Sequence, residues 1–140
     1  FIVGFPGETE EDFEALCDFV RWARFDRLGV FRYTDEDGTA ALELGDKVPR
    51  EEARARYRRL AAIQSEIMMD QLEAQVGSEA TVLVDSRRGA HQAIGRLASQ
   101  APEIDGVTFL KDADVRPGDM VRARITGTRA GTDLEASPAS

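Results

Sequence analysis

The stretch FIVGFPGE, residues 1–8, decides how the rest of this chain folds. Its first three residues are apolar and predict a buried strand, and the turn of glycine and proline after them leads directly into a helix. A strand on its own leaves backbone N–H and C=O groups unpaired, so strand 1–4 needs neighbours. We therefore expect the chain to be the C-terminal part of a larger protein, much of whose function lies outside this sequence.

The residues after this stretch predict a helix and then a second strand. Thr9 can cap the helix, with Asp12 three residues later in a capping-box arrangement. The helix ends near Arg24, and residues 27–33 form the next strand. A strand, a helix and a strand joined by short links make a βαβ unit, which implies a parallel sheet. The apolar face of the helix comprises Phe13, Leu16, Cys17 and Val20.

A loop and a long helix follow the second strand. Residues 34–48 are rich in acidic residues, glycine and threonine and predict a loop. Pro49 suits the first turn of a helix, which we expect to run to about Gln75, before Val76 and Gly77 end it. The expected buried stripe of this helix consists of Tyr57, Leu60, Gln64, Ile67 and Met68.

The pattern changes near residue 76, where short β-rich segments begin, separated by turns of glycine and proline. Five short strands in about 60 residues predict a small antiparallel barrel. The chain is therefore expected to divide into residues 1–48, a connecting helix at 49–75 and the barrel at 76–140. The predicted strands are residues 80–84, 90–97, 106–111, 120–126 and 132–136, and the turns between them include Pro102.

The charges argue against a dedicated nucleic-acid-binding protein, although a local basic face remains open. Residues 1–75 hold 17 acidic and 10 basic side chains, and residues 76–140 hold 9 acidic and 8 basic ones. Binding to nucleic acid usually needs a basic excess, because much of the affinity comes from neutralised phosphates. Neither part has that excess. Nothing in the sequence resembles a membrane span or a signal peptide.

The single cysteine and the single histidine limit the chemistry of this segment. One cysteine, Cys17, excludes a disulfide framework and a cysteine-ligated metal site made from this chain alone, and it points to a reducing, cytosolic setting. Its place on the apolar helix face predicts a buried small side chain rather than a nucleophile. We expect His91 on the surface, and we expect Phe19 and Trp22 to serve as packing residues.

Two loops at the C-terminal ends of the predicted parallel strands are candidate sites. The turn at residues 4–8 lets the backbone approach a ligand closely beside a helix N-terminus, but its spacing fits a plain strand-to-helix turn equally well. Residues 33–39 contain the acidic run Asp35, Glu36 and Asp37. That run has the groups for cation binding or acid–base chemistry, although such runs are more often solvated loops.

Basic residues of the barrel segment form a third candidate. Arg122 and Arg124 alternate along one predicted strand and so share a face. Such a stripe suits RNA, but Phe109 is the only aromatic residue of this segment, and proteins usually bind single-stranded nucleic acid with several stacking rings. A mixed surface is therefore the favoured interpretation.

Two of these motifs resemble the radical S-adenosylmethionine methylthiotransferases. The barrel of that family contains the run Ile-Val-Gly-Phe-Pro-Gly-Glu-Thr, matched by residues 2–9, and a Tyr-Ser-x-x-x-Gly-Thr loop, matched by residues 33–39 with Thr34 in place of serine. A long helix and a TRAM domain, a small OB-like barrel of five strands, then follow. The runs that look like the RimO branch of this family are residues 23–31, 101–107 and 132–134.

The resemblance implies an α/β fold for the first part of the chain, as the closing elements of a radical S-adenosylmethionine barrel. It implies a cytoplasmic enzyme that installs a methylthio group on an aspartate β-carbon of protein twelve of the small ribosomal subunit. S-adenosylmethionine and two 4Fe–4S clusters are the cofactors of the family. Its six cluster cysteines have no counterpart among the residues of this chain, which we therefore expect to bind neither cluster and to be inactive alone.

Two alternatives to this interpretation remain. One is the branch of the family that modifies transfer RNA, with a TRAM domain that binds RNA, and the other is a non-catalytic TRAM binding module. No membrane partner is expected. For the RimO branch, the resemblance implies that Gly4, Phe5, Pro6 and Gly7 line the S-adenosylmethionine site, that Tyr33, Gly38 and Thr39 shape the substrate entrance, and that Arg122 and Arg124 meet the ribosomal protein.

Overall fold

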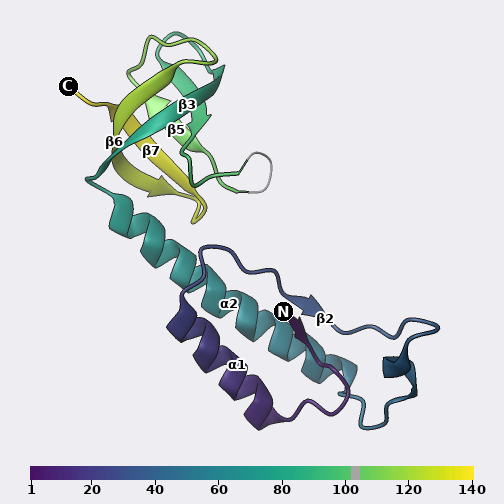
Figure 1. Cartoon of the computed structure of the whole chain (residues 1–140). Coiled ribbons are helices and arrows are strands. Elements are labelled where there is room, and N and C mark those ends of the chain that lie inside the picture. Colours follow the sequence, from purple (N-terminus) through teal and green to yellow (C-terminus); the bar gives the residue numbers. More distant parts are fainter. Residues whose placement is uncertain (102–104) are drawn as a thin grey trace. The chain divides into compact units, whose positions relative to one another are not determined.

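The computed structural model describes residues 1–101 and 105–140, which form two compact units, Phe1–Ile67 and Met68–Ser140 (Figure 1). A single long helix, α2 (Arg50–Gln75), supplies residues to both units. The predicted turn residue Pro102, and with it part of the run that looks like RimO, lies outside the described residues. Each unit has its own hydrophobic core.

The first unit begins with the predicted βαβ arrangement. Strand β1 (Ile2–Val3), helix α1 (Glu10–Ala23) and strand β2 (Phe31–Arg32) follow one another, and β1 pairs with β2 in parallel. Both strands are shorter than predicted. The capping box is confirmed, because the Asp12 N–H donates to the Thr9 hydroxyl at 3.1 Å and the Thr9 N–H donates to the Asp12 carboxylate at 2.9 Å.

Helices α1 and α2 share a core with β1. Val3 is fully buried among side chains from both helices. Cys17 of α1 is also fully buried, and this burial raises the pKa of its thiol. The predicted burial of this cysteine is therefore confirmed. The core of the first unit consists of Val3, Phe13, Cys17, Val20, Leu60, Ile63 and Ile67.

Part of the predicted buried stripe of α2 is wrong. Tyr57 is 39% exposed, whereas Arg56 and Ala53 are buried. Ala53, Arg56 and Leu60 fall at the spacing of one helix face, and so do Ile63 and Ile67, whereas Tyr57 falls at the margin of that face. Leu60, Gln64 and Ile67 are buried as predicted, and Met68 is half-buried.

The prediction that Phe19 and Trp22 are packing residues is wrong for Trp22, which is 80% exposed. The buried face of α1 is set by Phe13, Cys17 and Val20, and position 22 falls on the opposite side of the helix. Phe19 is itself half-exposed, and its ring lies 6.0 Å from the ring of Trp22, measured between centroids. The two rings therefore contact each other at the surface.

The second unit is a closed barrel of five strands, as predicted. The strand order around the barrel is β3-β4-β5-β7-β6, and β6 pairs back with β3. The prediction that every pair is antiparallel is wrong, because β5 and β7 run parallel. Directions must alternate around an antiparallel ring, so a closed ring with an odd number of strands contains at least one parallel pair. The strands are β3 (Glu79–Arg87), β4 (Gln92–Arg96), β5 (Thr108–Lys111), β6 (Met120–Arg129) and β7 (Asp133–Pro138).

Strand β4 passes unusually close to β3 at Gly95. A Cβ atom on Gly95 would collide with the carbonyl oxygen of Leu83 and would lie 2.6 Å from a methyl carbon of Val82. The neighbouring strand therefore excludes any side chain at this position. The barrel core consists of Leu72, Val82, Val84, Ala93, Leu97, Leu110, Ala113, Ala123, Ile125, Leu134 and Ala136.

Two further observations bear on function. Over residues 1–101 and 105–140, no helix combines the length and the apolar character that crossing a membrane would need. Among the same residues, no three side chains of His, Cys, Asp or Glu gather as a metal site would require. His91 is exposed, as predicted.

Candidate functional site

The turn between β1 and α1 is held in one conformation by its glycines and by hydrogen bonds. Gly4 and Gly7 adopt positive φ angles of 76° and 84°, which favour glycine. The Gly4 N–H donates to the Glu8 carboxylate at 3.1 Å, and the Gly7 N–H donates to the carbonyl oxygen of Asp46 at 2.9 Å. A Cβ atom on Gly4 would lie 2.6 Å from that of Ala53, so α2 comes too close for a side chain here.

Arg56 ties α2 to this turn. Its side chain is 4% exposed and donates to the Glu8 carboxylate at 2.6 Å and to the Glu8 carbonyl oxygen at 3.1 Å. It also pairs with the carboxylates of Glu10 and Glu52. One carboxylate, that of Glu8, therefore bridges the Gly4 N–H and a buried cation. Sequence reasoning missed Arg56, although an arginine at the apolar spacing of a helix is a signal that could have found it.

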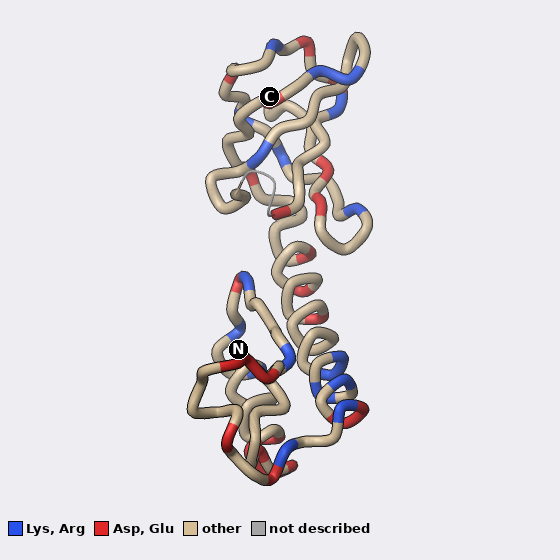
Figure 2. Tube along the Cα trace, turned by 90° about the vertical axis from the view of Figure 1, so that its right-hand side faces the viewer, with Lys and Arg blue, Asp and Glu red and all other residues tan. Residues whose placement is uncertain are grey.

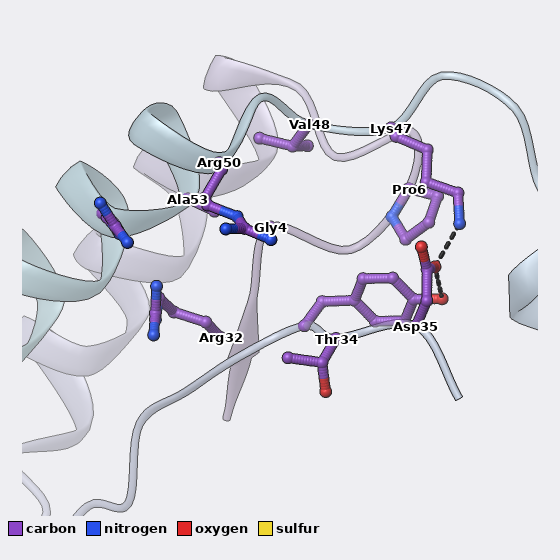
Figure 3. Close-up of a pocket in the computed structure, with 11 residues that line it drawn as sticks. Gly4, Pro6, Arg32, Thr34, Asp35, Lys47, Val48, Arg50 and Ala53 are labelled. Carbon is purple, nitrogen blue, oxygen red and sulfur yellow. Dashed lines mark hydrogen bonds and ion pairs between the residues drawn. The ribbon is translucent and has the colours of Figure 1, made fainter. Parts of the chain in front are cut away.

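A cavity of about 550 Å³ opens where the C-terminal ends of β1 and β2 meet the start of α2 (Figure 3). It brings together three of the predicted site residues, Gly4, Pro6 and Tyr33. Basic side chains from β2, from α2 and from the loop before α2 complete much of its lining. These basic residues are Arg32, Lys47, Arg50 and Arg54.

A second cavity, of about 270 Å³, includes the exposed side chain of Ile2 in its lining. Phe5, Tyr33 and Thr39, which are also predicted site residues, line the same cavity. The rings of Phe5 and Tyr33 meet edge to face, with their centroids 5.2 Å apart. Gly7 and Gly38 are exposed and line neither cavity.

Asp35, the first residue of the predicted acidic run, is engaged by two neighbours. The Tyr33 hydroxyl donates to its carboxylate at 3.0 Å, and Lys47 forms an ion pair with it (Figure 3). The hydrogen bond from Lys47, followed by that from Tyr33, lowers the pKa of Asp35 below its ordinary value of 3.8. Desolvation and the bond to Asp35 raise the pKa of Tyr33. This trio holds the Tyr33 ring at the end of β2.

The substitution Tyr33→Phe should raise the pKa of Asp35, because it removes a hydrogen bond to the ionised carboxylate. The folded-state pKa of Asp35 is depressed, so its stabilising effect is present above the unfolded-state pKa and is lost as pH falls through the folded-state pKa. The variant should lose this effect at a higher pH than the parent. An NMR titration of the Asp35 carboxyl carbon measures the shift, and an unchanged pKa would show that Lys47 alone sets it.

Arg122 and Arg124 lie on one face of β6, as predicted, but neither is a free cation. Both donate to the carboxylate of Glu79 on β3, at 2.8 and 2.9 Å, and these contacts lower the pKa of Glu79. Lys111 and Glu135 pair in the same way on β5 and β7. Figure 2 shows basic and acidic residues interspersed along the barrel strands and loops. The predicted mixed surface of the barrel is confirmed.

Comparison with known proteins supports the resemblance of the chain to RimO proteins and the resemblance of its barrel to a TRAM domain. Residues 76–138 match the family model of the TRAM domain. The chain is 52% identical over 128 residues to a protein of Sorangium cellulosum and to one of Desulforudis audaxviator, and 45% identical over 140 residues to one of a Nocardioides species. All three relatives are named ribosomal protein uS12 methylthiotransferase RimO.

These alignments take in 90%, 91% and 98% of this chain but only 26%, 28% and 29% of the respective relatives. The chain therefore spans little more than a quarter of the length of the curated relatives that it matches. The resemblance to this group of proteins and the presence of a TRAM domain are confirmed.

Proposed function

We propose that this chain, which carries a TRAM domain and is 45–52% identical to RimO proteins over at least nine tenths of its length, is the C-terminal part of an enzyme that methylthiolates an aspartate of ribosomal protein uS12. The names of the relatives support the reaction and the substrate. The mixed charge of the barrel supports a protein substrate over RNA, because a TRAM domain that holds RNA would need cations free of carboxylate partners.

One observation in the first unit carries the proposal. Ile2 and Phe31 are partners in the parallel register of β1 and β2, and their side chains are 57% and 64% exposed, while Val3 on the same sheet is fully buried. Parallel sheets in α/β proteins are covered on both faces. The exposed apolar pair is therefore what we expect if these two strands belong to a larger α/β barrel whose other elements would cover this face.

The cofactors of such an enzyme divide between this segment and the rest. In the complete enzyme, S-adenosylmethionine and the clusters would supply the radical chemistry and the sulfur chemistry of the reaction. The residues described here do not fit a cluster, because the single cysteine is buried and no metal-binding group is found among residues 1–101 and 105–140. The proposal therefore assigns cluster binding to other parts of the enzyme and no catalysis to this segment alone.

Of the two cavities described above, the one of about 270 Å³ is the better candidate for contact with S-adenosylmethionine and substrate. It lies against Ile2, which would face the interior of a completed barrel, and it presents the paired rings of Phe5 and Tyr33. Gly4, Pro6 and Gly7 would then act by fixing the turn that aims Phe5. Gly38 and Thr39 would shape the entrance, and Arg122 and Arg124 would exchange their shared partner Glu79 for acidic groups of uS12.

The substitution Phe5→Ala in the complete enzyme should weaken S-adenosylmethionine binding about tenfold, because it removes a ring that is half exposed in this cavity. Phe19→Ala is the matched control, since Phe5 and Phe19 are 42% and 43% exposed and only Phe5 lines the cavity. Equilibrium dialysis measures both. Equal binding by the two variants would remove Phe5 from the cofactor site. Substitution of Gly4 is a poorer test, because the clash with Ala53 would disturb the fold itself.

The substrate is tested by producing the complete enzyme with its clusters and presenting it with uS12 and with transfer RNA in parallel reactions. A mass increase of one methylthio group in place of hydrogen on a uS12 aspartate would support the proposal. Modification of transfer RNA, with uS12 unchanged, would place the chain in the RNA-modifying branch of the family instead.

A further inference from the structure

A groove lined by basic side chains runs along β2 and the first turns of α2. It consists of the cavity of about 550 Å³ described above and an adjoining one of about 530 Å³, which share Arg32 and Arg54. The first adds Lys47 and Arg50, and the second adds Arg58. The three arginines of α2 recur every four residues and so lie along one side of the helix. Figure 3 shows Arg32 and Arg50 among the side chains that surround the first of these cavities.

Most of the charge in this groove is uncompensated. Arg32, Arg50 and Arg58 form no hydrogen bond or ion pair with any side chain in the described part of the chain. Arg54 pairs with the exposed carboxylate of Glu51, and Lys47 pairs with the exposed carboxylate of Asp35. Three unpaired arginines beside one groove repel one another. The groove is therefore locally basic, although the net charge of the whole chain is −8. An anion seated between them would relieve this repulsion.

An exposed aromatic ring stands beside the arginines in the cavity of about 530 Å³. Tyr57 of α2 is 39% exposed and lines this cavity together with Arg32, Arg54 and Arg58. Phe31 also lines it, but this ring shares its face of the sheet with Ile2, which a completed barrel would cover. Guanidinium groups bind phosphate through paired hydrogen bonds, and exposed rings stack on bases. An acidic peptide would use the cations but would leave the ring of Tyr57 without a role. The combination therefore favours a ligand that carries both phosphate and a base.

We propose that this groove binds a nucleotide unit, with phosphate on its arginines and a base against Tyr57. Two sources offer that chemistry, a free mononucleotide and a strand of RNA. The groove adjoins the cavity of Phe5 and Thr39 and shares Arg32, Tyr33 and Thr34 with it. Tyr57 and the arginines of α2 line only the groove, and the proposal does not depend on methylthiotransferase activity. In the enzyme proposed above, further strands would precede β1 and add at its edge, because consecutive strands are usually neighbours, so the edge of β2 would stay open.

The test measures binding of a fluorescein-labelled single-stranded RNA of about ten nucleotides to the full chain by anisotropy, at several salt concentrations. The triple variant Arg32→Gln, Arg54→Gln, Arg58→Gln should bind at least about tenfold more weakly, and its slope of log K against log salt should be smaller by about 2, since each lost phosphate contact contributes about 0.7. Tyr57→Ala should also lose about tenfold, with the slope unchanged, because stacking releases no counterions.

The matched control carries the same charge change on the barrel, as Arg87→Gln, Arg88→Gln, Arg116→Gln. It should bind RNA within about twofold of the parent. No binding by the parent chain, or a larger loss in the barrel variant than in the groove variant, would overturn the proposal. Far-UV circular dichroism confirms that each variant keeps the helix content of the parent.

Two competitors identify the source of the ligand. If uridine monophosphate displaces the RNA from the parent chain but not from the triple variant, a free nucleotide is the ligand. If RNA stays bound to the parent in the presence of the mononucleotide, a strand of RNA is the ligand. A labelled peptide of consecutive aspartates serves as the third arm. If the peptide binds as tightly as the RNA, and if Tyr57→Ala does not lower the affinity for RNA, the groove is a general anion-binding surface and the nucleotide assignment fails.

Discussion

Replacing Arg56 by methionine should lower the free energy of unfolding of the first unit by about 3 kcal/mol. The variant removes a guanidinium that is 4% exposed and leaves the Glu8 carboxylate, itself only 11% exposed, without its cation. An uncompensated buried charge is among the most destabilising changes a folded protein can suffer. The Gly4 N–H depends on the same carboxylate, so its protection against hydrogen exchange should also fall.

Two further variants make this result specific. Arg54→Met, on the same helix two residues earlier, removes an arginine that is 45% exposed and pairs with an exposed Glu51, so it should change stability by less than about 0.5 kcal/mol. Arg56→Met combined with Glu8→Gln should recover part of the loss, because no charge is then left buried. Chemical denaturation followed at 222 nm reports the helices of this unit. Equal losses from Arg54→Met and Arg56→Met would refute the role given to the buried pair.

The substitution Gly95→Ala should destabilise the barrel by about 3 kcal/mol, the upper end of the cost of overpacking. The added methyl group meets a backbone carbonyl of β3, which cannot move aside as a flexible side chain would, and a methyl of Val82 at 2.6 Å. The two strands must therefore separate at a point where they pair with each other. Hydrogen exchange at the β3 and β4 amides measures this loss locally.

Gly127→Ala is the matched control in the same barrel. Gly127 lies at the register shift of β6, has no positive φ, and has its nearest neighbour 4.0 Å from a Cβ atom. Alanine should therefore be accepted there, with a stability change of about zero or a small gain from reduced freedom of the unfolded chain. If Gly95→Ala proves as mild as Gly127→Ala, the close approach of the two strands at Gly95 is not a real constraint.

Local signals in the sequence predicted the elements of both units, and contacts between distant residues account for what was missed. The capping box of Thr9 and Asp12 is complete within four residues, so the start of α1 could be predicted. The shared face of Arg122 and Arg124 follows from strand alternation. Their common partner Glu79 is brought in by the pairing of β3 with β6, which no local pattern contains.

The candidate site shows the same division. The turn at Gly4 and the loop at Tyr33 could be located because each follows a recognisable strand. Arg56 was overlooked because a charged residue on the buried face of α2 makes sense only once Glu8 lies opposite it. The arginine groove was overlooked because Arg32 belongs to one strand and its companions to a helix that begins 18 residues later.

The burial of Cys17 equips the first unit with a reporter of its own opening. Cys17 is the only thiol of the chain and is fully buried, so a thiol reagent added to the intact chain can reach it only when this unit opens. The rate of labelling, compared with that of an unfolded peptide, then gives the opening equilibrium without any introduced probe. Barrel opening that leaves the first unit closed is silent in this assay, so one reagent separates the stability of Phe1–Ile67 from that of the rest.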